Sequence, residues 1–446
     1  MSDAPSPNRL WIVLVGGTCA LFGIFALVYL LVWRVPNPHG AAAEVVLRNA
    51  VARLQARDQI APSDNGYTLL DSAVNGTSGA SVAALCGLAQ YSVGKRSEIV
   101  KLLNTHPGGL TRQVKDARSG LKVMRDALAR PAMTLPLDWS KGLMAAYPNY
   151  IGLRKISQHF TVLGMYDEMH GKYAEAAEAY ALGVAYGLRV QREGPVIQLM
   201  IGVAIQRIAL WPLVELLSAD ILDGPTTRKV LAILESAGAK ETDFLEDMDT
   251  EYALTVLTFN VLSSSTPAQL AQASGTNPPM QGVLNLFAFL KGPVLNRERI
   301  LYQNQYVEVR PFLERLDVAG AHARQNAQPS LAQRLRPSLF AGSMSLEFSR
   351  VMAQFKVSRT LLGAAEILAA LRLYFLDHRE YPAQLSALAP KYLGRVPLDL
   401  MNGGKPFSYR RVKRTYTLTT DSPDYALIGL PTRIPLHDPG GPVVMP

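Results

Sequence analysis

The most pronounced pattern along the chain is an apolar run near its N-terminus. From Leu10 to Trp33 the sequence holds no charged residue, while Arg9 and Arg34 stand at its two ends. A helix rises about 1.5 Å per residue, so a run of this length spans the roughly 30 Å hydrocarbon layer of a bilayer. We predict an N-terminal tail over 1–9 and one transmembrane helix over 10–33, which makes the lipid bilayer a partner of the chain.

A cleaved signal peptide is the alternative interpretation of this run. The apolar core of such a peptide is about 7 to 15 residues long and is followed by a small-x-small cleavage site. The run here is longer, and the sequence VWRVPNPHG at its end offers no such site. We therefore expect the helix to remain as an anchor.

Two features of the residues around the run favour opposite sides of the membrane for the body. The short tail carries only Arg9, whereas Arg34, Arg48, Arg53 and Arg57 follow the run, a bias that holds a segment in the cytoplasm. Long domains, however, cross a membrane largely regardless of their charge, and a short tail before a first span is typical of a signal anchor. We favour an exported body.

Apolar positions then recur with helical spacing over most of the body. Long segments are joined by short turns that contain glycine, which is typical of antiparallel helix packing. The predicted fold class is mainly α, with an α-helical domain over 41–262, a flexible loop over 263–282 and continuing helices over 283–376. Within the last part we expect helices over Arg297–Ala321 and a long helix over Ser343–His378.

The apolar run Pro195–Leu217 raises the question of a second membrane span. Its charged residues are Arg207 and Glu215, and it also contains Gln198 and Gln206. These polar side chains would be costly in lipid. We predict instead that the run is the buried central helix of the body.

The segment Leu163–Gly183, LGMYDEMHGKYAEAAEAYALG, resembles a tetratricopeptide repeat. Gly171 marks the turn of that pattern, Ala176 its small contact residue and Tyr180 its aromatic. A shift of about 34 residues in either direction finds no second copy, although a solenoid needs at least three stacked units. We therefore expect a single helical hairpin of this style and no superhelix.

After the long helix the sequence changes to short β-prone runs. PFSYRR and TYTLTT are separated by VKR, which predicts a β-hairpin. Tyr381 and Pro382 stop the long helix, and Pro397 to Gly404 turn the chain. We expect a small α/β end-module over 377–446 that includes a Pro/Gly-rich tail.

The end-module resembles the C-terminal region of type II secretion major pseudopilins. In these proteins a long helix leads into a tyrosine-proline turn, a P-x-D turn with glycines, and small strands. The matching positions are Tyr381, Pro382, Leu385, Leu388, Tyr392, Leu393, Pro397, Asp399, Gly404, Pro406 and Tyr409. The N-terminus lacks the pseudopilin processing motif and a long helical body intervenes, so we do not expect a processed pilin subunit.

In the order of its elements the chain also resembles a set of uncharacterised bacterial membrane-anchored helical proteins. The shared order is an N-terminal span, a helical body with a segment such as Gly194–Leu217, a later helix pair and a YP-x-x-L-x-x-L tail. That set has no established activity. The resemblance implies an architecture and a single-pass protein of the bacterial inner membrane whose body is periplasmic.

Composition indicates a folded body and narrows the partners. The chain has 446 residues, 48% hydrophobic and 18% charged, which is globular and large enough for two or three folded units. Its net charge of +9 resides in the C-terminal third, where Lys291–Arg414 holds 20 Lys and Arg against 9 Asp and Glu. Because these charges are dispersed along helices, with only YRRVKR clustered, we expect solvated faces and no nucleic-acid partner.

The sequence carries no motif that names a reaction. It lacks HExxH, paired CxxC, GxSxG and phosphate-loop patterns. Of the two cysteines, Cys19 lies in the predicted span, which leaves Cys86 without a disulfide partner in the body. Any catalytic residues stay unknown at this point, and we predict no cofactor-binding or metal-ligating residue and no cofactor.

Two groups in the helical body are the nearest approach to a site. Asp167 and His170 lie one helical turn apart, with His159 further up the helix, a spacing that could hold a metal. Surface pairing with solvent or salt bridges is the ordinary explanation of such residues. The acids of ETDFLEDMDTE, from Glu241 onward, are most simply a solvated stripe and secondarily a general-acid pair.

The end-module has its own acids, Asp399, Asp421 and Asp424. They are weak candidates for calcium ligands, and turn formation is the ordinary explanation of aspartate in such a segment.

Two functions are compatible with these sequence features. One is a scaffold or protein-interaction module of the envelope with a protein partner, and the alternative is a membrane-anchored hydrolase with an unrecognised active site. A scaffold predicts an exposed apolar or basic groove, whereas an enzyme predicts a cleft that gathers titratable groups with perturbed pKa values. We expect the scaffold.

Overall fold

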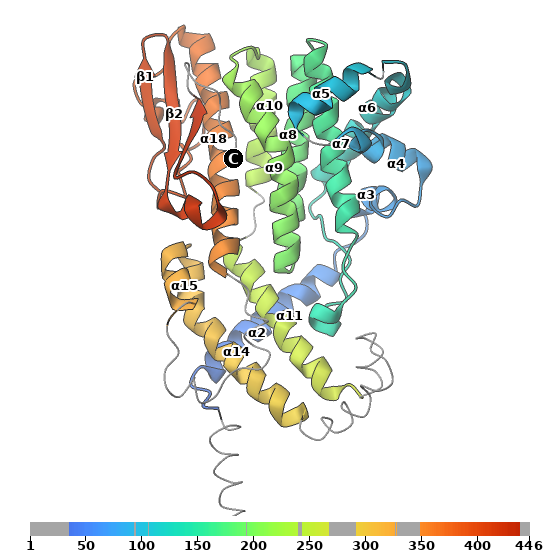
Figure 1. Ribbon diagram of the computed structural model, residues 1–446, viewed down its shortest axis with the longest axis vertical. Helices are drawn as coiled ribbons and strands as arrows, with labels where there is room; N and C mark the ends of the chain where they lie inside the picture. Colours follow the sequence, from blue (N-terminus) through green and yellow to red (C-terminus); the bar gives the residue numbers. More distant parts are fainter. Residues whose placement is uncertain are drawn as a thin grey trace, which may run out of the picture.

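The computed structural model describes residues 35–92, 95–105, 107–192, 194–239, 243–266, 291–325, 327 and 348–437. The predicted tail over 1–9 and the predicted transmembrane helix over 10–33 lie outside these residues, as does most of the predicted loop over 263–282. The described part is mainly helical and carries one small antiparallel sheet near its C-terminus (Figure 1). The mainly α fold class is confirmed at this level.

Two hydrophobic clusters, which we call the upper core and the lower core, meet along one long helix, α18 (Phe348–His378). The other helices of the upper core are α3 (Tyr67–Val74), α4 (Gly79–Cys86), η2 (Gly87–Tyr91), α5 (Arg96–Thr105), α6 (Pro107–Ala129), α7 (Tyr150–Met169), α8 (Tyr173–Val190), α9 (Val196–Ser218) and α10 (Gly224–Gly238). Those of the lower core are α2 (Gly40–Asp58), α11 (Phe244–Ser264), α14 (Lys291–Glu314) and α15 (Val318–Gln325), and the short η3 (Trp139–Met144) packs on α11.

Helices α7, α8 and α9 pack with their backbones close together because glycine stands where they cross. A Cβ at Gly187 of α8 would lie 2.4 Å from the amide nitrogen of Gln206 in α9, and one at Gly164 of α7 would lie 2.3 Å from the Tyr180 ring. Between α7 and α8 the chain turns at Gly171, whose φ of 71° suits glycine. The predicted helical hairpin is therefore present as α7 and α8, while its likeness to a tetratricopeptide repeat stays a prediction.

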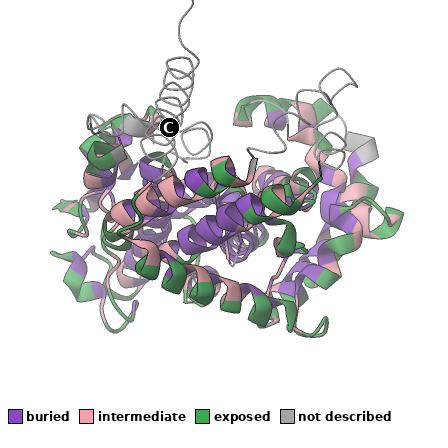
Figure 2. Ribbon diagram, turned by 90° about the horizontal axis from the view of Figure 1, so that it is seen from below, coloured by how far each residue is buried: buried purple, intermediate pink, exposed green. Residues whose placement is uncertain are grey.

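Helix α9 is the central helix of the upper core. Among the described helices it alone is long and apolar enough to cross a membrane, yet 61% of its most apolar stretch is buried inside the protein. Its Gln206 donates to the carbonyl of Ser358 at 3.4 Å and accepts from Gln191 at 2.7 Å. Figure 2 shows buried helices at the centre, enclosed by helices that expose one face. The prediction of a buried central helix is confirmed.

The lower core is built around tyrosine rings. Tyr252 of α11 stacks on Tyr302 and Tyr306 of α14, with ring centroids 5.9 and 4.5 Å apart. The helices predicted over Arg297–Ala321 are present as α14 and α15, which together extend beyond that range at both ends. The two helices are separated where Leu316 adopts a positive φ of 52° that an α-helix does not contain.

The end-module follows α18 and ends in a sheet of three strands in the order β1-β2-β3. Its elements are η4 (Leu385–Leu388), β1 (Ser408–Val412), β2 (Thr415–Asp421), η5 (Pro423–Ile428) and β3 (Arg433–His437). The predicted hairpin is present as β1 and β2, whereas β3 lies where a Pro/Gly-rich tail is predicted and corrects that prediction. The Tyr381 ring fastens the module to α18, at 4.9 Å from the Phe375 ring and 4.5 Å from that of Tyr416.

Candidate binding groove

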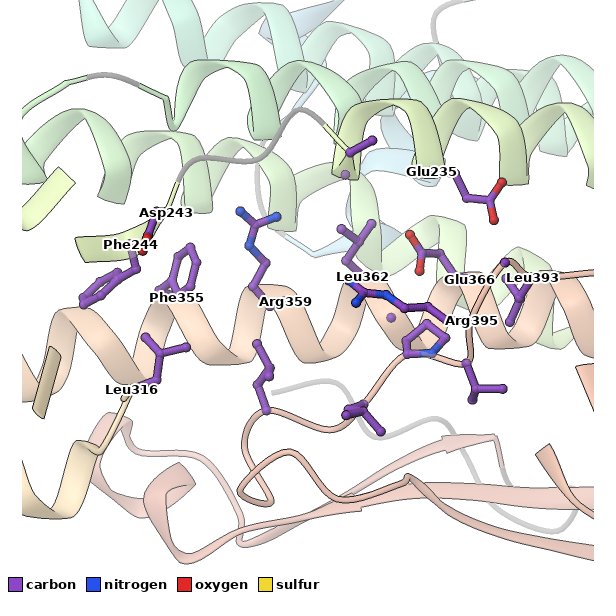
Figure 3. A pocket seen from close by; sticks show the side chains of 18 of the residues that line it. Glu235, Asp243, Phe244, Leu316, Phe355, Arg359, Leu362, Glu366, Leu393 and Arg395 are labelled. Atoms are coloured by element: carbon purple, nitrogen blue, oxygen red, sulfur yellow. The ribbon is translucent and has the colours of Figure 1, made fainter. Parts of the chain in front are cut away.

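A groove of about 860 Å³ lies where the two cores and the end-module meet. Its floor is α18, one wall is the C-terminal end of α10, and the opposite wall is the loop 393–400 (Figure 3). The start of α11 and the junction of α14 with α15 complete the lining. The groove therefore joins segments that are far apart in the sequence.

The floor follows from the helical periodicity of α18. Phe355, Arg359, Leu362 and Glu366 recur every three or four residues and therefore share one face of the helix. Gly363 lies beside them, and a Cβ there would lie 2.8 Å from the Cβ of Pro397. Glycine at this position lets the loop approach the helix closely enough to form a wall.

Two carboxylates lie at one end of the groove. Glu366 of α18 and Glu235 of α10 both line this end and extend into the space between the two helices, with their carboxylates turned to opposite sides in Figure 3. Burial raises the pKa of the Glu366 carboxyl to about 7, and the negative charge of Glu235 adds to this effect, while Arg359 and Arg395 oppose it. Within the described part of the chain neither carboxylate forms an ion pair. A negative site is thus left open to an occupant.

A fixed positive charge lies further along the floor. The Arg359 side chain is only 8% exposed, and its guanidinium stacks on the Phe355 ring at 4.9 Å from the centroid. Burial lowers the pKa of Arg359 to about 9, so the guanidinium remains charged at neutral pH. This charge also lowers the pKa of Glu366 and so opposes the effect of burial on that carboxyl.

The wall over 393–400 is held in place by Asp399. This buried carboxylate accepts a hydrogen bond from the Thr420 hydroxyl at 2.6 Å, from the Thr360 hydroxyl at 3.3 Å and from the Met401 amide at 3.0 Å. The loop is therefore tied both to β2 and to α18. Leu398 lines the groove from this wall and remains 51% exposed, which leaves apolar surface for a ligand to cover.

The three acids of the end-module have separate roles. Asp399 is surrounded by hydroxyl and amide donors, which suits the turn-forming role, while Asp421 pairs with Arg433 at 3.4 Å and Asp424 with Lys356 at 3.5 Å. The described residues contain no group of three or more His, Cys, Asp or Glu side chains that could hold a metal. The structure thus gives no support to the weak calcium candidates.

Each of the candidate metal residues of α7 also has a hydrogen-bond or ion-pair partner of its own. Asp167 pairs with Arg118, and the Nδ1 atom of His170 lies 2.7 Å from a carbonyl oxygen of α7. His159 is buried, and its Nδ1 accepts from the Leu88 amide at 3.0 Å. Burial lowers the pKa of His159 to about 3, so its ring is neutral at physiological pH.

The prediction of a solvated acidic stripe in ETDFLEDMDTE is wrong. Asp249 and Glu251 are only 5% and 7% exposed in the lower core. Asp249 accepts from the Tyr306 hydroxyl at 2.6 Å and binds the Arg310 guanidinium through both oxygens at 3.0 Å. Glu251 accepts from the Val196 amide at 2.9 Å, and burial raises the pKa of its carboxyl to about 7. The neighbours that cover these acids, α9 and α14, are distant in the sequence.

Glu235, Arg359 and Glu366 are candidate functional residues that sequence reasoning misses. One signal was available, since Glu366 is the single charged residue in the apolar stretch LLGAAEILAAL, where an acid is costly to bury. Its counterpart Glu235 has no local signal, because nothing in the sequence of α10 indicates which helix it faces.

Comparison of the chain with protein-family models, with curated proteins and with solved structures gives no match.

Proposed function

We propose that the chain is a single-pass membrane-anchored scaffold of the bacterial envelope, and that its groove binds a segment of a partner protein. The observation that carries the proposal is a groove of about 860 Å³ lined by apolar side chains and by fixed charges of both signs. Small-molecule sites bury most of their ligand, whereas protein segments dock along open grooves through a few apolar and charged anchors. The exposed Leu398 is an apolar anchor, and the carboxylate of Glu366 is a charged one.

The anchor in this proposal is the helix predicted over 10–33, and the proposed location is the bacterial inner membrane with a periplasmic body. The short N-terminal tail and the resemblance to membrane-anchored bacterial proteins support it. Protease added to spheroplasts tests the orientation, because an exported body is degraded at once. A body that resists protease until the inner membrane is lysed would overturn the location.

The pseudopilin-like end-module has a docking role in this proposal. It supplies the wall 393–400, so its contribution is to shape a binding surface rather than to build a pilus. The hairpin of α7 and α8, with its single tetratricopeptide-like pattern, supports the upper core behind the groove.

Site-specific photocrosslinking tests docking at the groove. A photoreactive residue at Leu398 lies in the groove, and one at Ile151, which is 71% exposed outside it, is the control. In cells, position 398 should crosslink to a discrete protein and position 151 should not. Ala239→Trp fills the groove from its rim and should abolish the crosslink, whereas Ser236→Trp, on α10 but outside the groove, should leave it. Crosslinks that ignore Ala239→Trp would overturn the proposal.

A membrane-anchored hydrolase is the second candidate, and one observation favours it. A carboxyl group whose pKa is about 7 can act as a general acid or base near neutral pH, and Glu366 shares its end of the groove with a second carboxylate, Glu235. A hydrolase would cleave the segment crosslinked at Leu398, and Glu366→Gln would make the intact adduct accumulate. A scaffold gives an adduct whose partner keeps its full length over time.

A further inference from the structure

We infer that the groove recognises a basic side chain, arginine or lysine, on the partner segment, and that Glu235 and Glu366 are the residues that hold it. This inference rests on the proposed docking function and names the chemistry of its ligand. It follows from the charges of the lining, from the geometry of the acidic end and from the positions of the two lining arginines.

The lining of the groove carries more negative than positive charge. Four acids face two arginines, and the acids are Glu235, Asp243, Glu314 and Glu366. A segment of positive charge is therefore attracted to the groove, and one of negative charge is repelled.

The acidic end is complementary to a cation in its geometry as well. Glu235 and Glu366 line the same end of the groove from two different helices, and their negative charges repel until a positive group lies near both. A guanidinium has five N–H donors in a planar fork and can serve both carboxylates at once, whereas an ammonium acts as a point charge. Leu362 and Leu393 lie beside the pair and can cover the methylene stem of such a side chain.

The arginines of the lining do not fill this position themselves. Arg395 is exposed on the loop and, in the described structure, lies beyond ion-pair distance of both carboxylates. Arg359 is held on the Phe355 ring two helical turns from Glu366. Both cations lower the cost of ionising Glu366 from a distance, and the space between the two carboxylates remains for the ligand.

The titration of Glu366 gives the recognition a pH dependence. The groups that face it are Glu235 from α10, Arg359 from its own helix and Arg395 from the loop. Because burial and Glu235 raise the pKa of Glu366 to about 7, the carboxyl is largely protonated in mild acid. A cationic ligand favours the ionised form, so its affinity should rise between about pH 6 and pH 8.

Peptide selection on the full chain in lipid nanodiscs tests the inference. A random-peptide phage library is panned at about pH 8, and the clones kept are those that bind wild type and Ser236→Trp but fail to bind Ala239→Trp. These groove-dependent peptides should share an Arg or Lys next to apolar residues. Replacing that Arg by citrulline, which is neutral and of the same shape, should weaken binding about tenfold or more.

A double-mutant cycle assigns the effect to the two carboxylates. Glu366→Gln and, independently, the exposed Glu235→Gln should each weaken the Arg peptide and leave the citrulline peptide unchanged. Glu380→Gln, an exposed acid outside the groove, is the matched control, and thermal denaturation of each variant shows that it is folded.

The outcomes separate this inference from the proposed function. Groove-dependent peptides without a basic residue, or an Arg peptide that tolerates citrulline, would overturn the inference and leave docking in place. A library that yields no clone sensitive to Ala239→Trp would overturn both.

Discussion

The upper and lower cores fill their interiors by opposite means. In the upper core glycine stands where α7, α8 and α9 cross, so that α8 and α9 meet backbone to backbone at Gly187 and the Tyr180 ring of α8 packs directly on α7 at Gly164. The lower core fills its space with stacked tyrosine rings and ionisable side chains, among them Asp249, Glu251 and the buried pair Arg297 and Glu298. The upper core should therefore respond to added volume, and the lower core to changes in charge.

The largest effect is expected from one added methyl group in the upper core. Gly187→Ala would place a Cβ 2.4 Å from the Gln206 amide nitrogen, and backbone yields less readily than a side chain. The free energy of unfolding should fall by about 3 kcal/mol, the upper end of the usual range for overpacking. Urea denaturation followed by circular dichroism measures it.

The control is Gly79→Ala at the start of α4, where nothing lies within 4 Å of the added Cβ. This change should alter stability by less than about 0.5 kcal/mol. Equal losses in the two variants would show that crossing distance does not limit the upper core.

A change of charge should have the next largest effect, in the lower core. Asp249→Asn removes one partner of the bond to Arg310, which costs roughly 3 to 5 kcal/mol for a fully buried pair. Because the Arg310 side chain is 30% exposed, we expect about 2 to 3 kcal/mol, measured by the same denaturation. Glu308→Gln, whose pair with Arg324 lies on the surface of α14, should cost less than about 0.5 kcal/mol.

A pH titration should sharpen the comparison further. The pKa of Glu251 is raised from 4.5 to about 7, so the folded state binds this proton more tightly than the unfolded state does. The associated stability is fully present below about pH 4.5 and is lost as the pH rises through 7. As the pH rises from 5 to 8, the free energy of unfolding of Glu251→Gln should increase by about 2 kcal/mol relative to that of wild type. A constant difference between the two proteins would contradict the assignment.

The smallest effect is expected from His159. Its contribution to stability changes with pH in the direction opposite to that of Glu251. Burial in the upper core lowers its pKa from 6.5 to about 3, so the associated stability is present above about pH 6.5 and is lost as the pH falls. Between pH 8 and pH 6 wild type should lose about 1 kcal/mol from this group. His159→Asn keeps an acceptor for the Leu88 amide and should make the free energy of unfolding nearly constant between pH 6 and pH 8. An unchanged slope in the variant would show that other groups cause the loss.

Local patterns predict those elements whose partners are close in sequence or whose burial is uniform. The hairpin of β1 and β2 follows from two β-prone runs joined by a turn, and α9 follows from an apolar run that its glutamines exclude from lipid. Strand β3 escapes prediction because RIPLH is short, contains Pro435 and pairs only with β2. The burial of Asp249 and Glu251 escapes it because α9 and α14 cover them.

The groove could not be predicted for the same reason. Its floor is a regular face of α18, but its walls come from α10 and from 393–400, and the approach of the loop depends on Gly363 and on Asp399. Each of these residues has an ordinary local explanation, as a helical glycine or a turn aspartate. Their joint effect exists only in the folded chain.

The hydrogen bond from Thr420 to Asp399 also means that the groove is complete only after β2 has been synthesised. A chain synthesised from its N-terminus delivers α10 and α18 before β2. Until β2 is in place, the loop 393–400 lacks one of its ties and the floor of the groove is uncovered. In the proposed docking role, a chain that ends before β2 would therefore present an incomplete groove.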